Sequence, residues 1–391
     1  MTKPDRPYRF ILSGGGTGGH IFPAVSIADE IKRRYPDADI LFVGASGRME
    51  MTRVPEAGYP IKGLPIAGIQ RSLSLSNLAV PFKVVSSLWK ARRIVRRFRP
   101  DVVIGTGGYA SGPVLFAASM LGIPTLIQEQ NGFAGVTNKI LARRVNTVCV
   151  AYEGLEKVFP AQKIVMTGNP VRSSITGAFL SHSGLSHREA QDIFGLEPGR
   201  RTFLVVGGSL GARAVNRAVQ DNLDILIDNG AQVLWQCGKY YYADYRRMLD
   251  QIIRSHPEKD YASRVALLPF ITEMDAAFAA ADIVVSRAGA GTLSELCLVG
   301  KPAILIPSPN VAEDHQRHNA LALSSRGAAV LITEGENLSH ELGDAIVRLL
   351  TDDALREELS KNIQSLARPN ATSDIVDQVE KLLGKTPKND R

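Results

Sequence analysis

Short apolar runs alternate with amphipathic segments along most of the chain. Runs of this kind occupy residues 8–12, 40–43, 101–104, 202–206 and 282–285, among others. Continuous short apolar runs are typical of parallel strands that are buried on both faces. The segments between them, such as residues 22–34 and 242–255, are expected to be helices. The alternation predicts an α/β protein built on doubly wound parallel sheets.

Four of the predicted strands end in a glycine-rich turn that opens a helix. The turns span residues 13–20, 105–112, 207–212 and 287–291. Such a turn lets a phosphate approach free N–H groups at the positive end of a helix dipole. Because one opening of this kind stands near the start of each half, we expect two similar domains, residues 1–168 and 169–369. Residues 168–172, Gly-Asn-Pro-Val-Arg, resemble a linker, and a final helix within residues 370–391 is expected to return to the first domain.

Residues 281–319 carry the most specific chemistry. A predicted buried strand leads through the turn at 287–291 into a helix that Thr292 or Ser294 is expected to cap. Glu295 is expected in the first turn of this helix. A carboxylate repels phosphate but accepts hydrogen bonds from a pair of sugar hydroxyls. The combination predicts a nucleoside diphosphate whose ribose lies beside its phosphates, and the polar cluster at 313–319 would contact a second sugar.

The first glycine turn permits other interpretations. Gly14, Gly16 and Gly19 satisfy the dinucleotide pattern GxGxxG, but residues 44–46 are Gly-Ala-Ser where a nicotinamide site needs an acidic residue. A P-loop is excluded because no Lys-Ser or Lys-Thr pair closes the glycine run. A tight turn without ligand is the alternative. His20 is the only histidine set in a glycine turn, and it suits either proton transfer near neutral pH or a hydrogen bond to the turn or to a diphosphate.

Length, charge and cysteine content narrow the class of protein. A chain of 391 residues exceeds what one core usually serves, which supports two domains. The net charge of +7 indicates an anionic partner, either nucleic acid, a membrane surface or a phosphorylated substrate. The polar N-terminus and the lack of an apolar run of roughly 18 residues predict a cytosolic protein without a signal peptide or membrane span. Cys149, Cys237 and Cys297 are expected to be small core residues, not disulfide or zinc partners.

Residues 69–99 change from apolar to strongly basic along their length. An amphipathic helix with a solvated basic side is one interpretation, with Val84, Leu88, Val95 and Phe98 near the packed face. A patch on an anionic bilayer is another, and a nucleic-acid site is disfavoured because aromatic residues do not interleave with the basic ones. We favour the bilayer patch, formed by Leu75, Leu78, Phe82, Lys83, Lys90, Arg93 and Arg97.

Taken together, the motifs resemble one family over nearly the whole chain. It is the family of bacterial transferases (the MurG family) that adds N-acetylglucosamine to undecaprenyl-diphosphate-linked N-acetylmuramoyl-pentapeptide, the last cytoplasmic step of peptidoglycan precursor synthesis. The motifs that carry the resemblance are Gly-Gly-Gly-Thr-Gly-Gly-His at 14–20, Glu-Gln-Asn-Gly at 129–132, Gly-Asn-Pro-Val-Arg at 168–172, Gly-Gly-Ser-Leu-Gly at 207–211, Ser-Arg-Ala-Gly at 286–289 with Thr292, Ser294 and Glu295, and His315, Gln316 and Asn319.

The resemblance implies a GT-B glycosyltransferase, with two Rossmann-like doubly wound parallel-sheet domains facing each other across a cleft. It implies inverting transfer from UDP-N-acetylglucosamine (UDP-GlcNAc) to the C4 hydroxyl of the lipid-linked muramoyl pentapeptide (lipid I), giving lipid II. We expect His20 to be the base, no cofactor or metal to be required, no nucleic-acid partner, and a peripheral location on the cytoplasmic face of the cell membrane.

Individual roles also follow from the resemblance. Glu295 would bind the ribose hydroxyls, the backbone of Ile271 would bind uracil with Arg172 near the base, and Gln316 and Asn131 would hold the N-acetylglucosamine. The full donor set is Thr17, Gly18, Gly19, Asn131, Arg172, Ser209, Ile271, Ala290, Gly291, Thr292, Leu293, Ser294, Glu295 and Gln316. The acceptor diphosphate is assigned to the turns that contain Gly14, Gly15, Gly105, Thr106 and Gly107.

Three alternatives stay open at this point. A UDP-GlcNAc 2-epimerase would need no lipid acceptor, a membrane-docking sugar-nucleotide sensor would tolerate loss of His20, and another lipid glycosyltransferase of the same fold, such as a galactosyltransferase, would differ in donor and acceptor. Leu210 stands where the family often has Gln, and we assign no role to this position. No function is assigned to residues 176–188.

Overall fold

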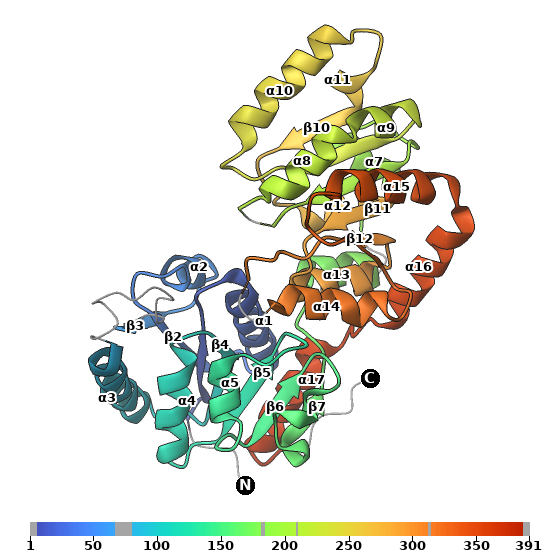
Figure 1. Cartoon of the computed structure of the whole chain (residues 1–391). Helices are drawn as coiled ribbons and strands as arrows, with labels where there is room; N and C mark the ends of the chain where they lie inside the picture. Colours follow the sequence, from blue (N-terminus) through green and yellow to red (C-terminus); the bar gives the residue numbers. More distant parts are fainter. Residues whose placement is uncertain (1–5, 67–79, 181–183, 209, 312–313, 386–391) are drawn as a thin grey trace. The chain divides into compact units, whose positions relative to one another are not determined.

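The structure, a computed structural model, describes residues 6–66, 80–180, 184–208, 210–311 and 314–385, with the backbone only at residues 80–82. The chain divides into two compact units, which are traced in Figure 1. Unit 1 comprises Met1–Arg172 and Asn370–Arg391, and unit 2 comprises Ser173–Pro369. Each unit is a parallel sheet covered by helices, which confirms the predicted doubly wound α/β class.

The sheet of unit 1 has, among the described residues, seven parallel strands in the order β3-β2-β1-β4-β5-β6-β7. The order reverses at β1, which pairs with both β2 and β4. Its strands are β1 (Arg9–Gly14), β2 (Asp39–Ala45), β3 (Ile61–Leu64), β4 (Val102–Gly107), β5 (Thr125–Glu129), β6 (Thr147–Val150) and β7 (Ile164–Met166). Its helices are α1 (Gly18–Arg34), α2 (Glu50–Glu56), α3 (Val80–Phe98), α4 (Ser111–Met120), α5 (Val136–Leu141) and α17 (Ala371–Leu382), with short 3-10 turns η2 (Leu155–Lys157) and η3 (Ala161–Lys163).

The sheet of unit 2 repeats this plan with six described parallel strands in the order β10-β9-β8-β11-β12-β13. Its strands are β8 (Thr202–Val206), β9 (Gln232–Gln236), β10 (Val265–Leu268), β11 (Ile283–Ser286), β12 (Ala303–Leu305) and β13 (Val330–Leu331). Its helices are α6 (Ser173–Leu180), α7 (His187–Ile193), α8 (Arg213–Asp221), α9 (Leu223–Asp228), α10 (Tyr242–Ser255), α11 (Tyr261–Arg264), α12 (Met274–Ala280), α13 (Ala290–Val299), α14 (His315–Ser324), α15 (Leu338–Thr351) and α16 (Asp353–Ser365).

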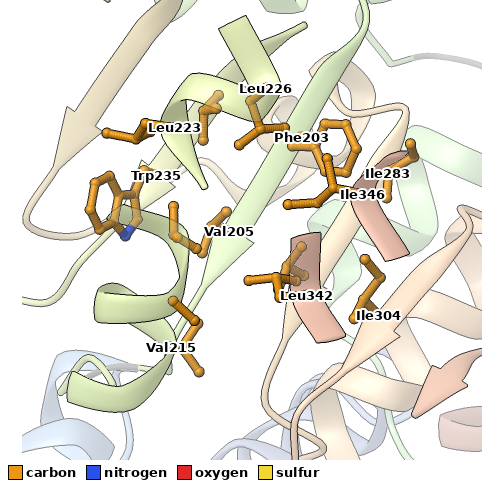
Figure 2. Close-up of a cluster of buried hydrophobic side chains, with 14 of the residues drawn as sticks. Phe203, Val205, Val215, Leu223, Leu226, Trp235, Ile283, Ile304, Leu342 and Ile346 are labelled. Atoms are coloured by element: carbon orange, nitrogen blue, oxygen red, sulfur yellow. The ribbon is translucent and has the colours of Figure 1, made fainter. Parts of the chain in front are cut away.

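The core of unit 2 forms because alternate residues of the central strands point to the same face of the sheet. Phe203 and Val205 of β8 lie on one face with Ile283 of β11, and Figure 2 shows them directed toward Leu342 and Ile346 of α15. Each of these five side chains is at most 1% exposed. Intervening strand residues, such as Leu204 and Val284, are equally buried on the other face. Burial on both faces is what the continuous apolar runs predicted.

The last helix, α17, packs in unit 1 against α1 (Figure 1). Ile375, Val376 and Val379 enter the core of that unit with at most 1% exposure. Arg34 of α1 binds α17 by an ion pair with Asp377, with a shortest distance of 2.6 Å, and by hydrogen bonds to the backbone oxygen and hydroxyl of Ser373. A helix remote in the sequence therefore completes the fold around the N-terminal strands.

Candidate active site

His20 lies at the carboxyl end of the unit 1 sheet, in the first turn of α1. The sequence predicted that this helix begins at Phe22, but it begins at Gly18. Pro23 therefore lies in its second turn. The backbone oxygen of His20 accepts a hydrogen bond of 2.7 Å from the hydroxyl of Thr106 in β4. The imidazole Nδ1 lies 2.9 Å from Oε1 of Gln130, directly after β5, whereas Nε2 has no hydrogen-bond partner among the described residues.

The glycines around His20 allow other backbone segments to approach it closely. A Cβ on Gly107 would lie only 2.9 Å from both Cε1 and Nδ1 of the imidazole, and the φ of Gly107 is +103°. A Cβ on Gly14 would overlap the hydroxyl oxygen of Thr106. Both positions therefore need glycine because a larger residue would displace the histidine or the threonine that holds it.

The β4 residues assigned to an acceptor diphosphate also make structural contacts, and that assignment stays a prediction. Gly105 lies inside β4, where it pairs with residues of both β1 and β5, and its missing side chain makes room for Ser111 and Leu115 of α4. Thr106 donates its hydroxyl to His20 and is fully buried. Thr106 and Gly107 thus position His20, and Gly105 admits a helix.

Two buried carboxylates shape the loops beside His20. Glu50 lies outside the sequence motifs, and Glu129 belongs to the motif at 129–132 but had been given no role of its own. Glu50 is fully buried and accepts hydrogen bonds of 2.9 Å from the backbone N–H groups of Gly16 and Ala45. Its carboxylate also fills the space that a side chain on Gly15 would need. Glu50 therefore fixes the first glycine turn against the end of β2.

Glu129, 1% exposed, does the same for the turn after β5. Its oxygens accept hydrogen bonds from the backbone N–H groups of Asn131 and Gly135 and from the side chain of Asn138, at 2.8–3.1 Å. The side chain of Asn131 also donates to Glu129, at 3.3 Å. Asn131, predicted to hold the transferred sugar, is therefore anchored by the acidic residue two positions before it.

The other residues of unit 1 that were predicted to bind the donor are Thr17, Gly18, Gly19 and Arg172. Thr17 is the exposed N-cap of α1, and Gly18 and Gly19 form the first turn with His20. Arg172 is the last residue of unit 1 before the chain enters unit 2. The predicted donor set thus draws on both units of the chain.

The glycine turn after β11 presents the start of α13 at the carboxyl end of the unit 2 sheet. The N–H groups of Ala290, Gly291 and Thr292 have no backbone acceptor among the described residues, whereas that of Leu293 donates to Gly289 at 3.0 Å. The Leu293 side chain is fully buried, so this residue supports the helix from the core. The start of this ten-residue helix therefore has three N–H groups without a backbone partner among the described residues, a local arrangement that suits an anion.

Two details of the α13 prediction are wrong. No side chain caps the helix, because it already begins at Ala290 and the hydroxyl of Ser294 instead donates to the oxygen of Ala290 at 3.0 Å. Glu295 consequently lies in the second turn, not the first, and is only 8% exposed.

Helix α14 holds the loops around this turn. Oε1 of Gln316 accepts a 2.9 Å hydrogen bond from the N–H of Ser308, after β12, and its amide nitrogen has no partner among the described residues. The buried Asn319 donates to the oxygen of Ala288 at 3.3 Å. Gln316 thus carries a donor group at the same edge of the sheet as the start of α13, consistent with a ligand-binding role.

Arg287 joins the same loops from within the turn itself. Its guanidinium donates to the backbone oxygens of Ile306 and Pro307 at 3.0 and 3.2 Å and pairs with Glu334 at 2.6 Å. One side chain therefore fixes together the loops that follow β11, β12 and β13. Arg287 belongs to the motif at 286–289, but the sequence assigned it no role of its own.

Ile271 lies after β10, and its side chain is 2% exposed. Its N–H donates to Oε1 of Gln236 at 3.3 Å, and Nε2 of Gln236 donates to the oxygen of Gly208 at 2.8 Å. Gln236 therefore ties the loop predicted to bind uracil to the glycine turn after β8. Ser209 of that turn lies outside the described residues, and Leu210 is 77% exposed.

Helix α3 exposes its basic residues and also part of its apolar surface. Lys83, Lys90, Arg93 and Arg97 are all exposed, as predicted for the patch, while Leu75, Leu78 and the Phe82 side chain lie outside the described residues. Val84 is 38% exposed, contrary to its predicted place near the packed face. The helix packs through its buried residues, Ser87, Ala91, Ile94 and Val95, and leaves Val85 and Trp89 each 66% exposed.

The described residues contain no group of three or more His, Cys, Asp or Glu side chains placed to hold a metal ion. Nor does any helix in the described part of the chain have the length and apolar character needed to cross a bilayer. All three cysteines are free and buried, which confirms their predicted place in the core.

Both halves of the chain match family models. Residues 10–150 match the glycosyltransferase family 28 N-terminal domain, and residues 202–379 match the glycosyltransferase family 28 C-terminal domain. Two Rossmann-like domains with these matches define a glycosyltransferase of the GT-B class.

Relatives specify the family more closely. A protein of Christiangramia forsetii, named UDP-N-acetylglucosamine–N-acetylmuramyl-(pentapeptide) pyrophosphoryl-undecaprenol N-acetylglucosamine transferase, is 53% identical over 96% of this chain and 98% of its own length. The protein of that name from Parabacteroides distasonis is 51% identical over 97% of this chain and 100% of its own length. The chain belongs to this transferase family.

Solved structures agree with that assignment. The crystal structure of Acinetobacter baumannii MurG matches with a TM-score of 0.75 and 30% identity, over 96% of this chain and 100% of that one. A UDP-N-acetylglucosamine 2-epimerase structure matches with a TM-score of 0.63 but only 14% identity, over 98% of this chain and 99% of that one. The epimerase shares the fold alone, so the transferase interpretation is supported over the epimerase alternative.

Proposed function

We propose that this protein transfers N-acetylglucosamine from UDP-GlcNAc to the C4 hydroxyl of N-acetylmuramyl-pentapeptide linked through pyrophosphate to undecaprenol. The observation that carries the proposal is His20, whose Nε2 has no hydrogen-bond partner among the described residues and lies at the carboxyl end of a sheet. The chain is also 53% identical to a transferase of that name.

The proposed reaction is a single inverting displacement. The acceptor hydroxyl oxygen forms a bond to the anomeric carbon while that carbon's bond to the β-phosphate oxygen breaks, and the electron pair leaves with UDP. The hydroxyl proton passes to Nε2 of His20, which acts as general base. Thr106 and Gly107 serve this step by holding His20 in place.

Charge that develops on the diphosphate would be stabilised by the N–H groups of Ala290, Gly291 and Thr292. Donors fixed before the reaction starts cost no reorganisation in the transition state. Glu295 would accept hydrogen bonds from the ribose hydroxyls, and the carbonyl of Ile271 would accept from uracil. Gln316 and Asn131 would bind the transferred sugar. No step of the proposed reaction uses a metal or a cofactor.

We place the enzyme at an anionic membrane surface, because its acceptor carries a polyprenyl chain. Lys83, Lys90, Arg93 and Arg97 supply exposed positive charge on α3, and the exposed Val85 and Trp89 lie on the same helix. Apolar side chains beside arginines suit the boundary between lipid headgroups and acyl chains. The cytoplasmic face is the side that carries both the donor and anionic lipid.

The test is transfer of labelled N-acetylglucosamine from UDP-GlcNAc to a short-chain analogue of the lipid-linked muramoyl pentapeptide. We expect product from the wild type and a loss in kcat of about 100-fold or more for His20→Ala. Equal product from both would remove the base role, and no product from a wild type that still binds UDP-GlcNAc would refute the transferase function.

The membrane contact is tested separately. Replacing Lys90, Arg93 and Arg97 with Glu should abolish sedimentation with anionic vesicles at low salt but not transfer to the soluble acceptor. Unchanged sedimentation would exclude this basic surface as the membrane contact.

A further inference from the structure

A chain of buried side-chain amides connects His20 to the linker motif at residues 168–172. Nδ1 of His20 contacts Oε1 of Gln130, and Nε2 of Gln130 contacts Oε1 of Gln128. Nε2 of Gln128 then donates to Oδ1 of Asn169 at 2.9 Å. Gln128, Gln130 and Asn169 are each at most 2% exposed, so water does not compete for these contacts.

Backbone oxygens fix the orientation of two amides in this chain, those of Asn169 and Gln130. Nδ2 of Asn169 donates to the backbone oxygen of Gln130 at 2.9 Å, which turns Oδ1 of Asn169 toward Gln128. Nε2 of Gln130 donates to the backbone oxygens of Thr106 and Gln128 at 2.8 and 3.0 Å. A flipped Gln130 amide would place its oxygen against these two oxygens and against Oε1 of Gln128. The hydrogen-bond partners of Gln130 therefore exclude the flipped orientation of its amide.

The fixed amide determines which imidazole nitrogen carries the proton. Because Oε1 of Gln130 is only an acceptor, the neutral imidazole must donate to it from Nδ1–H. Nε2 then carries the lone pair. We propose that Gln130 is a positioning residue that holds His20 as the Nδ1–H tautomer, so that Nε2 is the atom that accepts the acceptor's proton. The catalytic consequence rests on the function proposed above, but the tautomer itself does not.

The arrangement also supports the charged state that the reaction creates. When Nε2 takes the proton, the positive charge spreads over both nitrogens, and the Nδ1–H bond to Gln130 becomes a charge-assisted one. The uncharged amide of Gln130 can stabilise the imidazolium in this way. A buried carboxylate in its place would lie beside the backbone oxygens of Thr106 and Gln128 and the side-chain oxygen of Gln128. His20 and Gln130, whose contact determines the tautomer, are 110 positions apart in the chain.

The experiment compares Gln130→Met, which has similar length but only a weakly accepting sulfur in place of the amide, with Gln130→Glu. A buried carboxylic acid has its pKa raised, and in its protonated form it can accept from Nδ1–H and donate to Thr106 as the amide does. Thr106→Val is the matched control, because it removes the other hydrogen bond to His20, the one to its backbone oxygen, and leaves Nδ1 untouched.

The first readout is the 15N NMR spectrum of histidine-labelled protein, with His20→Ala used to assign His20 among the seven histidines. We expect the Nδ1–H tautomer in the wild type, Thr106→Val and Gln130→Glu, and mainly Nε2–H in Gln130→Met. The second readout is transfer, where Gln130→Met should lose about 10- to 100-fold in kcat with little change in either KM, and Gln130→Glu should recover much of the loss.

Three results would overturn the inference: an Nε2–H tautomer in the wild type, full kcat in Gln130→Met, or a lower kcat with the tautomer unchanged, which is what a merely structural role predicts. If Gln130→Met does not fold, the wild-type tautomer and the Gln130→Glu kinetics decide the question. A wild type without transferase activity would refute the proposed function alone, since the tautomer is measured without substrate.

Discussion

Replacing Gly107 with Ala tests whether the close approach of β4 to the imidazole sets the position of His20. The added Cβ would meet Cε1 and Nδ1 at 2.9 Å, whereas ordinary contacts of a Cβ lie at 3.4–4 Å. The ring or the strand must therefore move by about 0.5 Å. Because misplacement of a catalytic group by about 1 Å can cost 100-fold, we expect kcat to fall by roughly 10- to 100-fold.

Gly122→Ala is the matched control for backbone strain. Gly122 has a φ of +70° in the same unit, but a Cβ there would meet nothing within 4 Å. Both variants should lose about 1–2 kcal/mol of unfolding free energy from the left-handed backbone, measured by urea titration. Only Gly107→Ala should also lose kcat, measured with both substrates saturating, while the KM for UDP-GlcNAc stays near the wild-type value. Equal kcat in the two variants would refute the reasoning.

The remaining predictions concern stability, reactivity and cofactors. Arg34→Met should lower the free energy of unfolding, measured by urea titration, by about 2 kcal/mol, because Arg34 is 15% exposed and binds α17. Arg33→Met should lower it by less than about 0.5 kcal/mol, because Arg33 is 70% exposed. Similar losses in the two variants would contradict the role of Arg34. Burial raises the pKa of the Cys149 and Cys297 thiols to about 12, so neither should be alkylated by iodoacetamide in the native protein at pH 7.5, as judged by mass spectrometry; labelling of either would contradict its burial. Transfer activity should persist in EDTA, and its loss with recovery on adding Mg²⁺ would show that a metal is required.

Regular elements were predictable because local patterns determine them. The run at 202–206 became β8 and the segment at 242–255 became α10, both with the predicted bounds. Helix starts were less predictable. Thr292 and Ser294 are residue types that often cap helices, yet the chain entered α13 earlier, through Gly289, without a side-chain cap.

Site residues were predictable where a motif displayed them and hidden where distant contacts define them. His20 stood out because it follows a glycine run. Glu50 did not stand out, because its role depends on a hydrogen bond from the backbone N–H of Gly16, 34 residues away. Gln130 lay within a recognised motif, but its orientation depends on oxygens from Thr106 and Gln128. A single sequence gives no spacing rule for such partners.

The course of the chain through the two units affects how the protein folds during synthesis. Unit 2 is one continuous segment, Ser173–Pro369, inserted into unit 1, whose last helix comes from Asn370–Arg391. On the ribosome, unit 2 is complete before unit 1, although the β1–β7 sheet is made first. Until α17 emerges, the surface formed by Ile27, Ile31 and their neighbours lacks the apolar side chains that cover it. We therefore expect the N-terminal half to be the part that depends on chaperones, and a nascent chain stalled before residue 370 to bind them most strongly.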